Sequence, residues 1–165
     1  GFTVTSQPKG STPLVLAAFA GEAKIMRLLA DHKADLSLKA SNGLTPLLTA
    51  AGVSRFRPEN AVPEEKLLAA VKMALELGSD INETDPGGNT ALHGAAYRGA
   101  NSIAQYLIDH GARLDAKDEQ GRMPVNIADG AIAGPYFRAH DETAALLREL
   151  MGPSAPPRPT SQGAR

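Results

Sequence analysis

The stretch that decides the fold runs from residue 90 to residue 101 and reads TALHGAAYRGAN. Its opening, a threonine followed by a leucine and a pair of alanines, recurs along the chain in related form. The other copies read TPL with AA at residues 12–18, TPL with AA at 45–51, and MPV with a single A at 123–128. The four openings, at residues 12, 45, 90 and 123, are 33, 45 and 33 residues apart. A recurring period of this length indicates a stack of structural repeats.

A second marker keeps the same spacing. The segments KADL at 33–36, GSDI at 78–81 and GARL at 111–114 are 45 and then 33 residues apart. Both markers therefore show the same excess of twelve residues in the middle of the chain. The insertion that causes it must lie between Ala51 and Gly78.

Each unit carries the signals of two helices. A threonine stands at the N-cap position of three units, and a proline follows in two of them at the first helical position, where its missing N–H does no harm. The alanine pair lets a neighbouring helix approach closely, and a second, leucine-rich helix follows. A glycine in the left-handed backbone conformation ends that helix. In the first unit Lys33 takes its place, which should lower the stability of the fold by about 1 kcal/mol. Tight turns are predicted at Asn42-Gly43, Pro86-Gly87-Gly88 and Gln120-Gly121.

These segments resemble ankyrin repeats, with their Thr-Pro-Leu-x-x-Ala-Ala and Gly-Ala-Asp-x-Asn signatures, over about residues 7–152. The resemblance implies an all-α solenoid of four helix-turn-helix repeats whose connecting turns project as fingers. We expect repeats at about 7–39, 40–84, 85–117 and 118–152, followed by a disordered Pro-rich tail at 153–165. The stretch 91–101 is similar to bacterial multi-repeat ankyrin proteins.

Two units have long loops between their helices. The insertion in the second unit spans residues 52–63, and the proline and acids at 63–65 predict the start of a helix longer than its neighbours. In the fourth unit, residues 130–141 separate the two helices. Each loop contains a Phe-Arg pair, and we expect the two loops on one rim of the stack, about 20 Å apart, with Tyr97-Arg98 between them.

Two interpretations of this rim stay open. Aromatic and arginine side chains are enriched in binding hot spots, which favours a partner-facing groove. The residues of that groove are Arg55, Phe56, Arg57, Tyr97, Arg98, Phe137 and Arg138. In the other interpretation, both phenylalanines fold inward under their own loops, and the arginines cap the C-termini of helices.

The resemblance implies a further set of partner-binding residues, because ankyrin proteins commonly bind through finger tips and the exposed ends of the first helices. The residues at these positions are Asn42, Leu44, Asn89, Gln120 and Arg122 on the fingers, and Phe19, Tyr97 and Arg98 near the helix ends. We expect structural roles for the histidines: His93 forms hydrogen bonds within its repeat, while His32 and His110 lie exposed near helix C-termini.

The composition argues against several other functions. Seventeen basic and eighteen acidic residues give a net charge of −1, so the chain lacks the field that attracts nucleic acid or anionic membranes. It has no cysteine, no apolar run of membrane-spanning length, no histidine pair at metal-ligand spacing, and no nucleophile-elbow or phosphate-binding motif. We therefore expect no catalytic residue, cofactor, metal site or membrane insertion.

The predicted function is recognition of a protein partner by a non-enzymatic scaffold that is monomeric or part of a longer chain. The alternative is a passive spacer, or the C-terminal cap of a longer repeat or multidomain protein, because residues 1–10 lead into the first unit without a polar capping helix. The chain is expected to be soluble. Since it begins at Gly1, the sequence assigns no compartment, and export stays open.

Overall fold

The computed structural model describes residues 10–53, 62–131 and 139–158. Within these ranges the chain is helical and contains no strand, in agreement with the predicted all-α solenoid. The helices are α1 (Pro13–Phe19), α2 (Ala23–Asp31), α3 (Pro46–Ala51), α4 (Glu64–Glu76), α5 (Ala91–Arg98), α6 (Asn101–Asp109), α7 (Pro124–Ala128), α8 (Asp141–Met151) and a short 3-10 helix, η1 (Gly152–Ser154).

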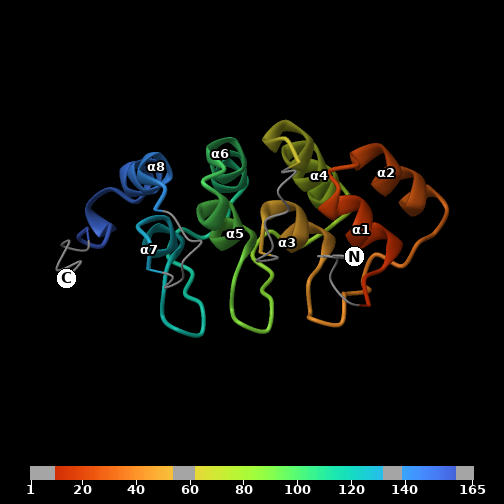
Figure 1. Ribbon diagram of the computed structural model, residues 1–165, viewed down its shortest axis with the longest axis horizontal. Coiled ribbons are helices and arrows are strands. Elements are labelled where there is room, and N and C mark those ends of the chain that lie inside the picture. Colours follow the sequence, from red (N-terminus) through yellow and green to blue (C-terminus); the bar gives the residue numbers. More distant parts are fainter. Residues whose placement is uncertain (1–9, 54–61, 132–138, 159–165) are drawn as a thin grey trace, which may run out of the picture.

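The α-helices form a row of pairs (Figure 1). Each odd-numbered helix contacts the even-numbered helix that follows it, and each helix also contacts its counterpart in the next pair. The odd-numbered helices make an inner layer and the even-numbered helices an outer layer. The connections between pairs project beyond the inner layer as fingers, all on the same side (Figure 1).

The inner helices begin as their sequences predict. The hydroxyl of Thr12 accepts a hydrogen bond from the N–H of Val15 at 3.2 Å, and the hydroxyl of Thr45 accepts one from Leu48 at 3.2 Å. Proline occupies the first turn of α1, α3 and α7. At the start of α7, where the threonine is missing, the side chain of Asn126 accepts a hydrogen bond from the backbone N–H of Met123 at 2.9 Å.

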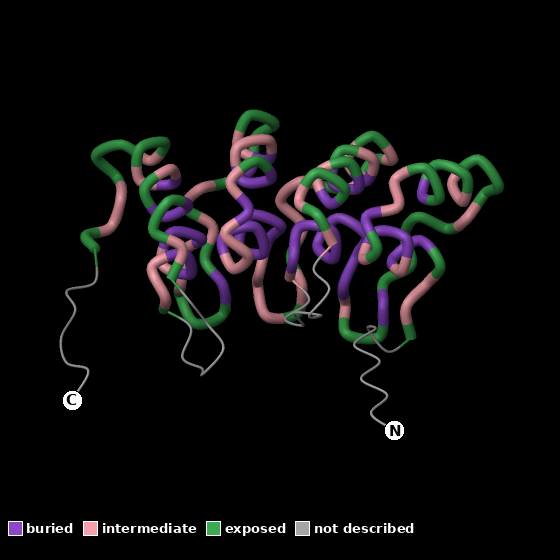
Figure 2. Tube along the Cα trace, turned by 45° about the horizontal axis from the view of Figure 1, so that its top comes forward, coloured by how far each residue is buried: buried purple, intermediate pink, exposed green. Residues whose placement is uncertain are grey.

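Small residues let the inner helices approach one another closely. The predicted alanine pairs are all buried, with at most 6% of any of them exposed; they are Ala17, Ala18, Ala50, Ala51, Ala95 and Ala96. A Cβ atom on Gly94 of α5 would lie only 2.7 Å from the backbone nitrogen of Val53. Figure 2 shows the consequence, since buried residues concentrate in the inner layer, while exposed ones lie on the outer helices and at the tips of the fingers around residues 41–42 and 119–121.

Polar contacts join the outer layer from one pair to the next. The starts of α4, α6 and α8 each bond to the start of the preceding outer helix or to its N-cap residue: Lys66 to Glu22 at 3.1 Å, Ser102 N–H to Glu64 at 2.8 Å, and Thr143 to Asn101 at 2.6 Å. At the other end, the side chain of Asn82 donates to the carbonyl of Gly111 at 3.1 Å and accepts from the N–H of Arg113 at 2.9 Å. We call this two-bond contact the Asn82 clamp.

Two further expectations concern the ends of elements. Helix α4 begins at Glu64 and is 13 residues long, against 9 for both α2 and α6, so the prediction of a longer helix is confirmed. At the C-terminal end, the described chain continues through η1 to residue 158, and the disorder of the Pro-rich tail stays a prediction. Residues 159–165 lie outside the described part.

Lys33 holds the backbone conformation that glycine adopts in the other pairs. Its φ angle is +63°, and it is the only non-glycine residue with a positive φ in the described ranges. Gly78 and Gly111, at the same position of the next two pairs, have φ angles of +94° and +96°. A side chain in this region clashes with its own backbone, so Lys33 is strained.

The substitution Lys33→Gly should therefore raise the free energy of unfolding by about 0.5–1 kcal/mol, the gain being limited by the greater freedom of glycine in the unfolded chain. Urea denaturation followed by circular dichroism measures it. Gly111→Lys is the matched control, because a Cβ there meets no atom within 4 Å. Gly111→Lys should lower the free energy of unfolding by a similar amount. An unchanged free energy of unfolding in either variant would contradict the strain assigned to Lys33.

Candidate functional site

The second finger, residues 85–89, is built around the carboxylate of Asp85. One oxygen accepts hydrogen bonds from the backbone N–H groups of Gly87 at 2.9 Å and Asn89 at 2.8 Å. The side-chain amide of Asn89 also donates to both carboxylate oxygens, at 3.0 and 3.1 Å. Asn89 holds its own finger together, and its predicted contact with a partner stays a prediction.

The third finger, residues 118–122, has the same arrangement, with the guanidinium of Arg122 in place of the Asn89 amide. Asp118 accepts from the N–H groups of Gln120 at 3.0 Å and Arg122 at 2.8 Å, and the guanidinium of Arg122 bonds its second oxygen at 2.7 Å. Burial alone would raise the pKa of Asp118, but these hydrogen bonds outweigh it and lower the pKa below its ordinary value. Arg122 also donates to the side chain of Gln120 at 2.7 Å, so both predicted contact residues lie together at one tip.

Fingers two and three are also joined to each other, because the N–H of Glu119 donates to the carbonyl of Gly87 at 2.9 Å. The first finger, residues 40–44, has Ala40 where the others have aspartate and lacks that carboxylate. Its tip residue Asn42 is exposed, as predicted. Leu44 was predicted to contact a partner, and this was wrong: it is only 3% exposed, because its apolar side chain packs into the core.

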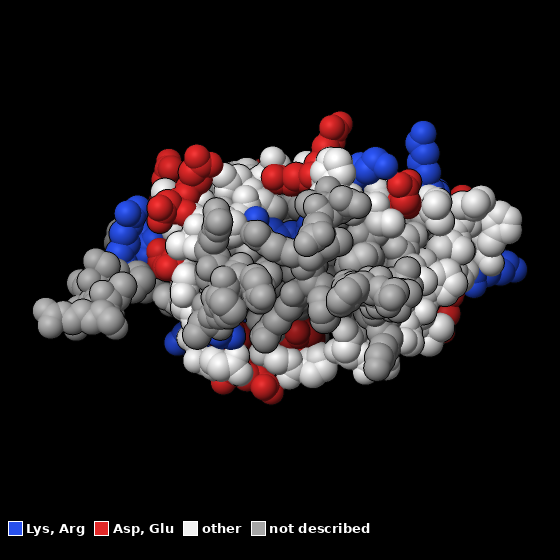
Figure 3. All heavy atoms as spheres, viewed as in Figure 1, with Lys and Arg blue, Asp and Glu red and all other residues white. Residues whose placement is uncertain are grey.

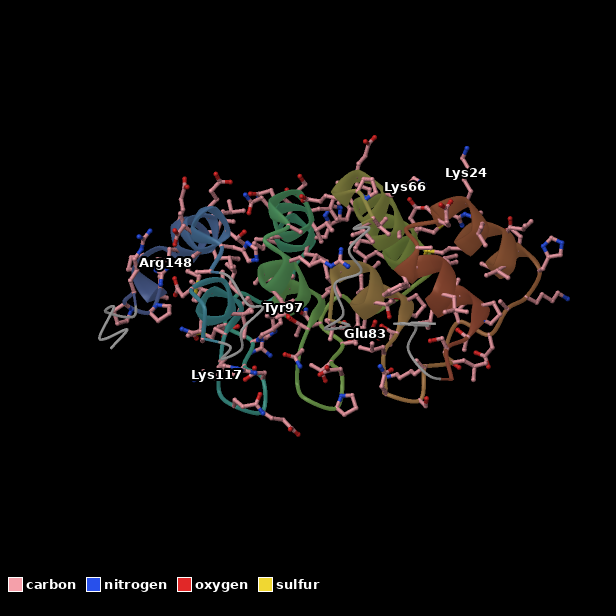
Figure 4. All side chains as sticks on the ribbon, in the orientation of Figure 1. Lys24, Lys66, Glu83, Tyr97, Lys117 and Arg148 are labelled. Atoms are coloured by element: carbon pink, nitrogen blue, oxygen red, sulfur yellow. The ribbon has the colours of Figure 1, made fainter. Side chains whose placement is uncertain are left out.

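The predicted residues at the helix ends lie at the C-termini of α1 and α5. Phe19 is partly exposed, and so are Tyr97 and Arg98. The side chain of Arg98 lies against Gly52, and Tyr97 borders a hollow of about 20 Å³, room for about one water molecule. The carbonyl of Tyr97 is 3.1 Å from Nε2 of His140, which links α5 to the segment before α8. Figure 4 places Tyr97 near the middle of the row.

The remaining predicted residues of the rim are Arg55, Phe56, Arg57, Phe137 and Arg138, and they lie outside the described ranges. Among the described predicted residues, the structure brings Tyr97 and Asn89 to the border of one hollow and joins Gln120 to Arg122 at the third finger. The choice between a partner-facing and an inward-folded rim stays a prediction.

His93 is a structural residue, as the sequence suggested. Its Nδ1 accepts a hydrogen bond from the N–H of Thr90 at 3.2 Å, so Nε2 carries the proton and donates it to the carbonyl of Arg122 at 2.9 Å. The imidazole thus joins the start of α5 to the third finger. Burial lowers the pKa of His93 below its usual value of 6.5, against the opposing effects of the Arg122 carbonyl, Asp118 and Asp85.

His32 and His110 lie at the C-terminal ends of α2 and α6. Nδ1 of His32 lies 2.8 Å from the carbonyl of Leu28, and Nδ1 of His110 lies 2.7 Å from that of Tyr106. Both side chains are exposed, as predicted. Across the described ranges, no three histidine, aspartate or glutamate residues are grouped to hold a metal ion.

The visible surface carries charges of both signs without a single extended patch of one sign. Acidic side chains gather over α8, whose first turn contains Asp141 and Glu142, and lysine or arginine side chains lie near both ends of the row (Figure 3). None of the described helices has the combination of length and apolar character needed to span a bilayer.

Sequence reasoning missed two surface features at the first pair. One is a cavity bordered by Glu83 and Lys39, and the other is a group of exposed apolar side chains on α2, Ile25 and Leu28. One sequence feature could have indicated the cavity. Ser37 occupies the repeat position that Asn82 occupies in the second unit, where the asparagine side chain forms the Asn82 clamp.

Paired helices in a row, hairpin fingers tied by carboxylates and close packing through alanine define the class of helical-repeat scaffolds. The chain belongs to the ankyrin repeat family: the model for ankyrin repeats (many copies) matches residues 74–128, and the model for a single ankyrin repeat matches residues 9–41. Ankyrin repeats are generally modules for protein–protein interaction, and the family is typically non-enzymatic.

Three similar proteins match different shares of the chain. The chain is 32% identical over 116 residues to human ankyrin repeat and KH domain-containing protein 1, covering 69% of the chain and 4% of that protein. It is 32% identical over 137 residues to mouse ankyrin repeat and SOCS box protein 16, covering 82% and 29%. It is 40% identical over 62 residues to human protein phosphatase 1 regulatory subunit 27, covering 38% and 40%.

The chain thus spans less than half the length of each of these relatives. All three are animal proteins, so the comparisons do not show the bacterial type that the sequence suggested.

The buried, neutral His93 makes a prediction about pH. Because its folded pKa lies below the unfolded value, its contribution to stability is complete above a pH of about 6.5 and declines as the pH falls through that region. His93→Gln should lower the free energy of unfolding by about 1–3 kcal/mol at pH 8, because one flexible amide does not reproduce both the bond from Thr90 N–H and the bond to the Arg122 carbonyl, and the difference from the wild type should shrink at pH 5. Urea unfolding at several pH values measures it.

Asn82→Ala is the control for this experiment. It removes the two hydrogen bonds of the Asn82 clamp and no titrating group, so its loss of stability should stay constant over the same pH range. A His93→Gln difference that is equally constant would contradict the role given to burial.

Proposed function

We propose that the chain is a non-catalytic module that binds a protein partner through its fingers and the exposed ends of its inner helices. The observation that carries the proposal is the construction of the fingers. Asp85 and Asp118 hold fingers two and three from within, and the bond from Glu119 to Gly87 holds them to each other. A surface held in this way loses little conformational entropy on binding.

The residues proposed to contact the partner exclude Leu44. Among the described residues they are Phe19, Asn42, Asn89, Tyr97, Arg98, Gln120 and Arg122, and the proposal extends to Arg55, Phe56, Arg57, Phe137 and Arg138 of the two long loops. Tyrosine and arginine at the centre of this surface fit the usual composition of binding hot spots. With a net charge of −1, nucleic acid is not proposed as a partner.

Affinity purification with three forms of the protein tests the proposal. The rim variant replaces Phe56, Arg57, Tyr97 and Arg98 with alanine. The control variant replaces Lys24, Glu65 and Gln105 with alanine on the outer helices, away from the fingers. A specific partner should co-purify with the wild type and the control and be lost from the rim variant, because hot-spot truncations cost about 2 kcal/mol or more each.

Circular dichroism should first show that all three forms keep the same helix content. A partner that binds the rim variant as well as the wild type, and is lost from the outer-helix variant, would contradict the proposed surface.

A specific observation favours a second candidate, a spacer or cap within a longer repeat array. Ile25 on α2 is 46% exposed, whereas Ala70 and Ile103, at the same position of the next two pairs, are fully buried. At that position of the fourth pair, Thr143 is 1% exposed and bonds Asn101 of the preceding pair. Side chains at this position therefore contact the preceding pair. The exposed Ile25 and Leu28 then form a surface for a further helix pair.

The array candidate predicts that an uncovered first pair is the least stable part of residues 1–165. In hydrogen exchange followed by mass spectrometry, α1 and α2 should exchange at least about tenfold faster than α5 and α6, since local opening needs less energy there.

The double variant Ile25→Glu/Leu28→Glu should abolish any concentration-dependent association in sedimentation. Equal protection of the first and third pairs would count against this candidate.

A further inference from the structure

The boundary between the first and second pairs lacks the clamp found at the next boundary. Asn82 follows the second pair and reaches forward to Gly111 and Arg113. At the same position of the first pair stands Ser37, whose hydroxyl and N–H both bond the carboxylate of Asp35, at 2.6 and 2.9 Å. Because the shorter side chain bonds locally, the connection at 36–39 is not tied to residues 78–80 in this way.

A cavity of about 380 Å³ lies at this unclamped boundary. Its apolar wall comes from Leu14 of α1, Ala74 of α4, and Leu36 and Leu77. Leu36 is 39% exposed, although it belongs to the wall of the cavity. A space of this size with an apolar wall accommodates a complete long side chain.

The polar side of the cavity is formed by Glu83, Asp80 and Lys39. Glu83 is half-buried, and its carboxylate accepts a hydrogen bond from the hydroxyl of Thr45. Burial raises the pKa of Glu83, while Thr45 and Lys39 act against the rise and Asp80 adds to it. Two carboxylates against one ammonium leave a net negative charge, and Glu83 retains unused acceptor positions. Figure 4 places Glu83 just below α3.

We propose that this cavity receives an arginine side chain presented by the protein partner. The proposal rests on the function proposed above and names a chemical feature of the partner. The guanidinium would donate paired hydrogen bonds to Glu83 at the polar side, and the aliphatic stem would pack against Leu36 and Leu77. The binding residues are thus not confined to the fingers and helix ends.

Arginine fits this cavity better than other groups of the same charge. Its planar fork matches a carboxylate with two parallel hydrogen bonds, and it loses its hydration shell more readily than the ammonium of lysine. A phosphate or an acidic peptide would meet Glu83 and Asp80 at the polar side. The cavity therefore selects a basic segment of a protein.

The test uses N-acetyl-L-arginine amide as the probe and the methyl signals of leucines in the NMR spectrum as the readout. Signals of Leu14, Leu36 and Leu77 should shift saturably, with a dissociation constant on the order of 1 mM, as befits a single side chain. The citrulline analogue keeps the shape and loses the charge. It should bind about tenfold more weakly or not at all.

Three variants complete the test. Glu83→Gln keeps an acceptor for Thr45 and should weaken probe binding about tenfold, while Glu149→Gln, which makes the same charge change on α8, should leave it unaltered. Ser37→Asn should restore a clamp and weaken binding by narrowing the cavity. Absence of saturable shifts in the wild type, equal shifts with citrulline, or equal binding by Glu83→Gln would each overturn the proposal.

The outcome is separable from that of the proposed function, because the probe binds without any partner. A partner that needs Tyr97 and Arg98 can be found even if the arginine probe fails. Equally, the probe can bind in this cavity when no partner depends on the fingers.

Discussion

The close approach of the inner helices is the constraint on which the rest of the structure depends. Alanine pairs on α1, α3 and α5 leave no side chain that would hold neighbouring helices apart, and Gly94 has no room even for a methyl group beside Val53. Since every pair contacts only its neighbours, each such contact stabilises the row locally, and the stability of the whole is close to a sum over boundaries. A larger residue at one of these positions would separate two pairs and leave the helices themselves intact.

Much of this architecture follows from the sequence, because it depends on local rules that recur with the period. Thr12 and Thr45 cap their helices, and Gly78, Gly111 and the strained Lys33 all adopt the expected left-handed conformation. These features need only the residue and its place in the repeat. Phe56 and Phe137 of the long loops lie outside the described residues, so their assigned roles stay predictions.

The candidate site followed from the sequence less completely, for reasons that particular residues make clear. Leu44 was assigned to the exposed fingers from its position, although an apolar side chain at the base of a finger gains free energy by turning into the core. The cavity at Glu83 depends on the distance between two connections, which no single repeat encodes. In the sequence, only the comparison of Ser37 with Asn82 points to the cavity. That comparison is informative only once the structure shows that Asn82 bonds to the next pair while Ser37 bonds locally.

The difference between the fingers has a thermodynamic consequence for recognition. Fingers two and three are ordered before a partner arrives, so contacts with Gln120 or Arg122 would be largely enthalpic, with a small entropic cost. The first finger has Ala40 in place of the tying carboxylate. It is held by backbone hydrogen bonds between Ala40, Gly43 and Leu44 and by one bond from Leu44 N–H to the side chain of Asn42, so it has fewer side-chain bonds than the other fingers and more conformational freedom to lose when a partner binds Asn42. Calorimetry would then separate partners by where they bind, since those that grip the first finger would show the larger unfavourable entropy.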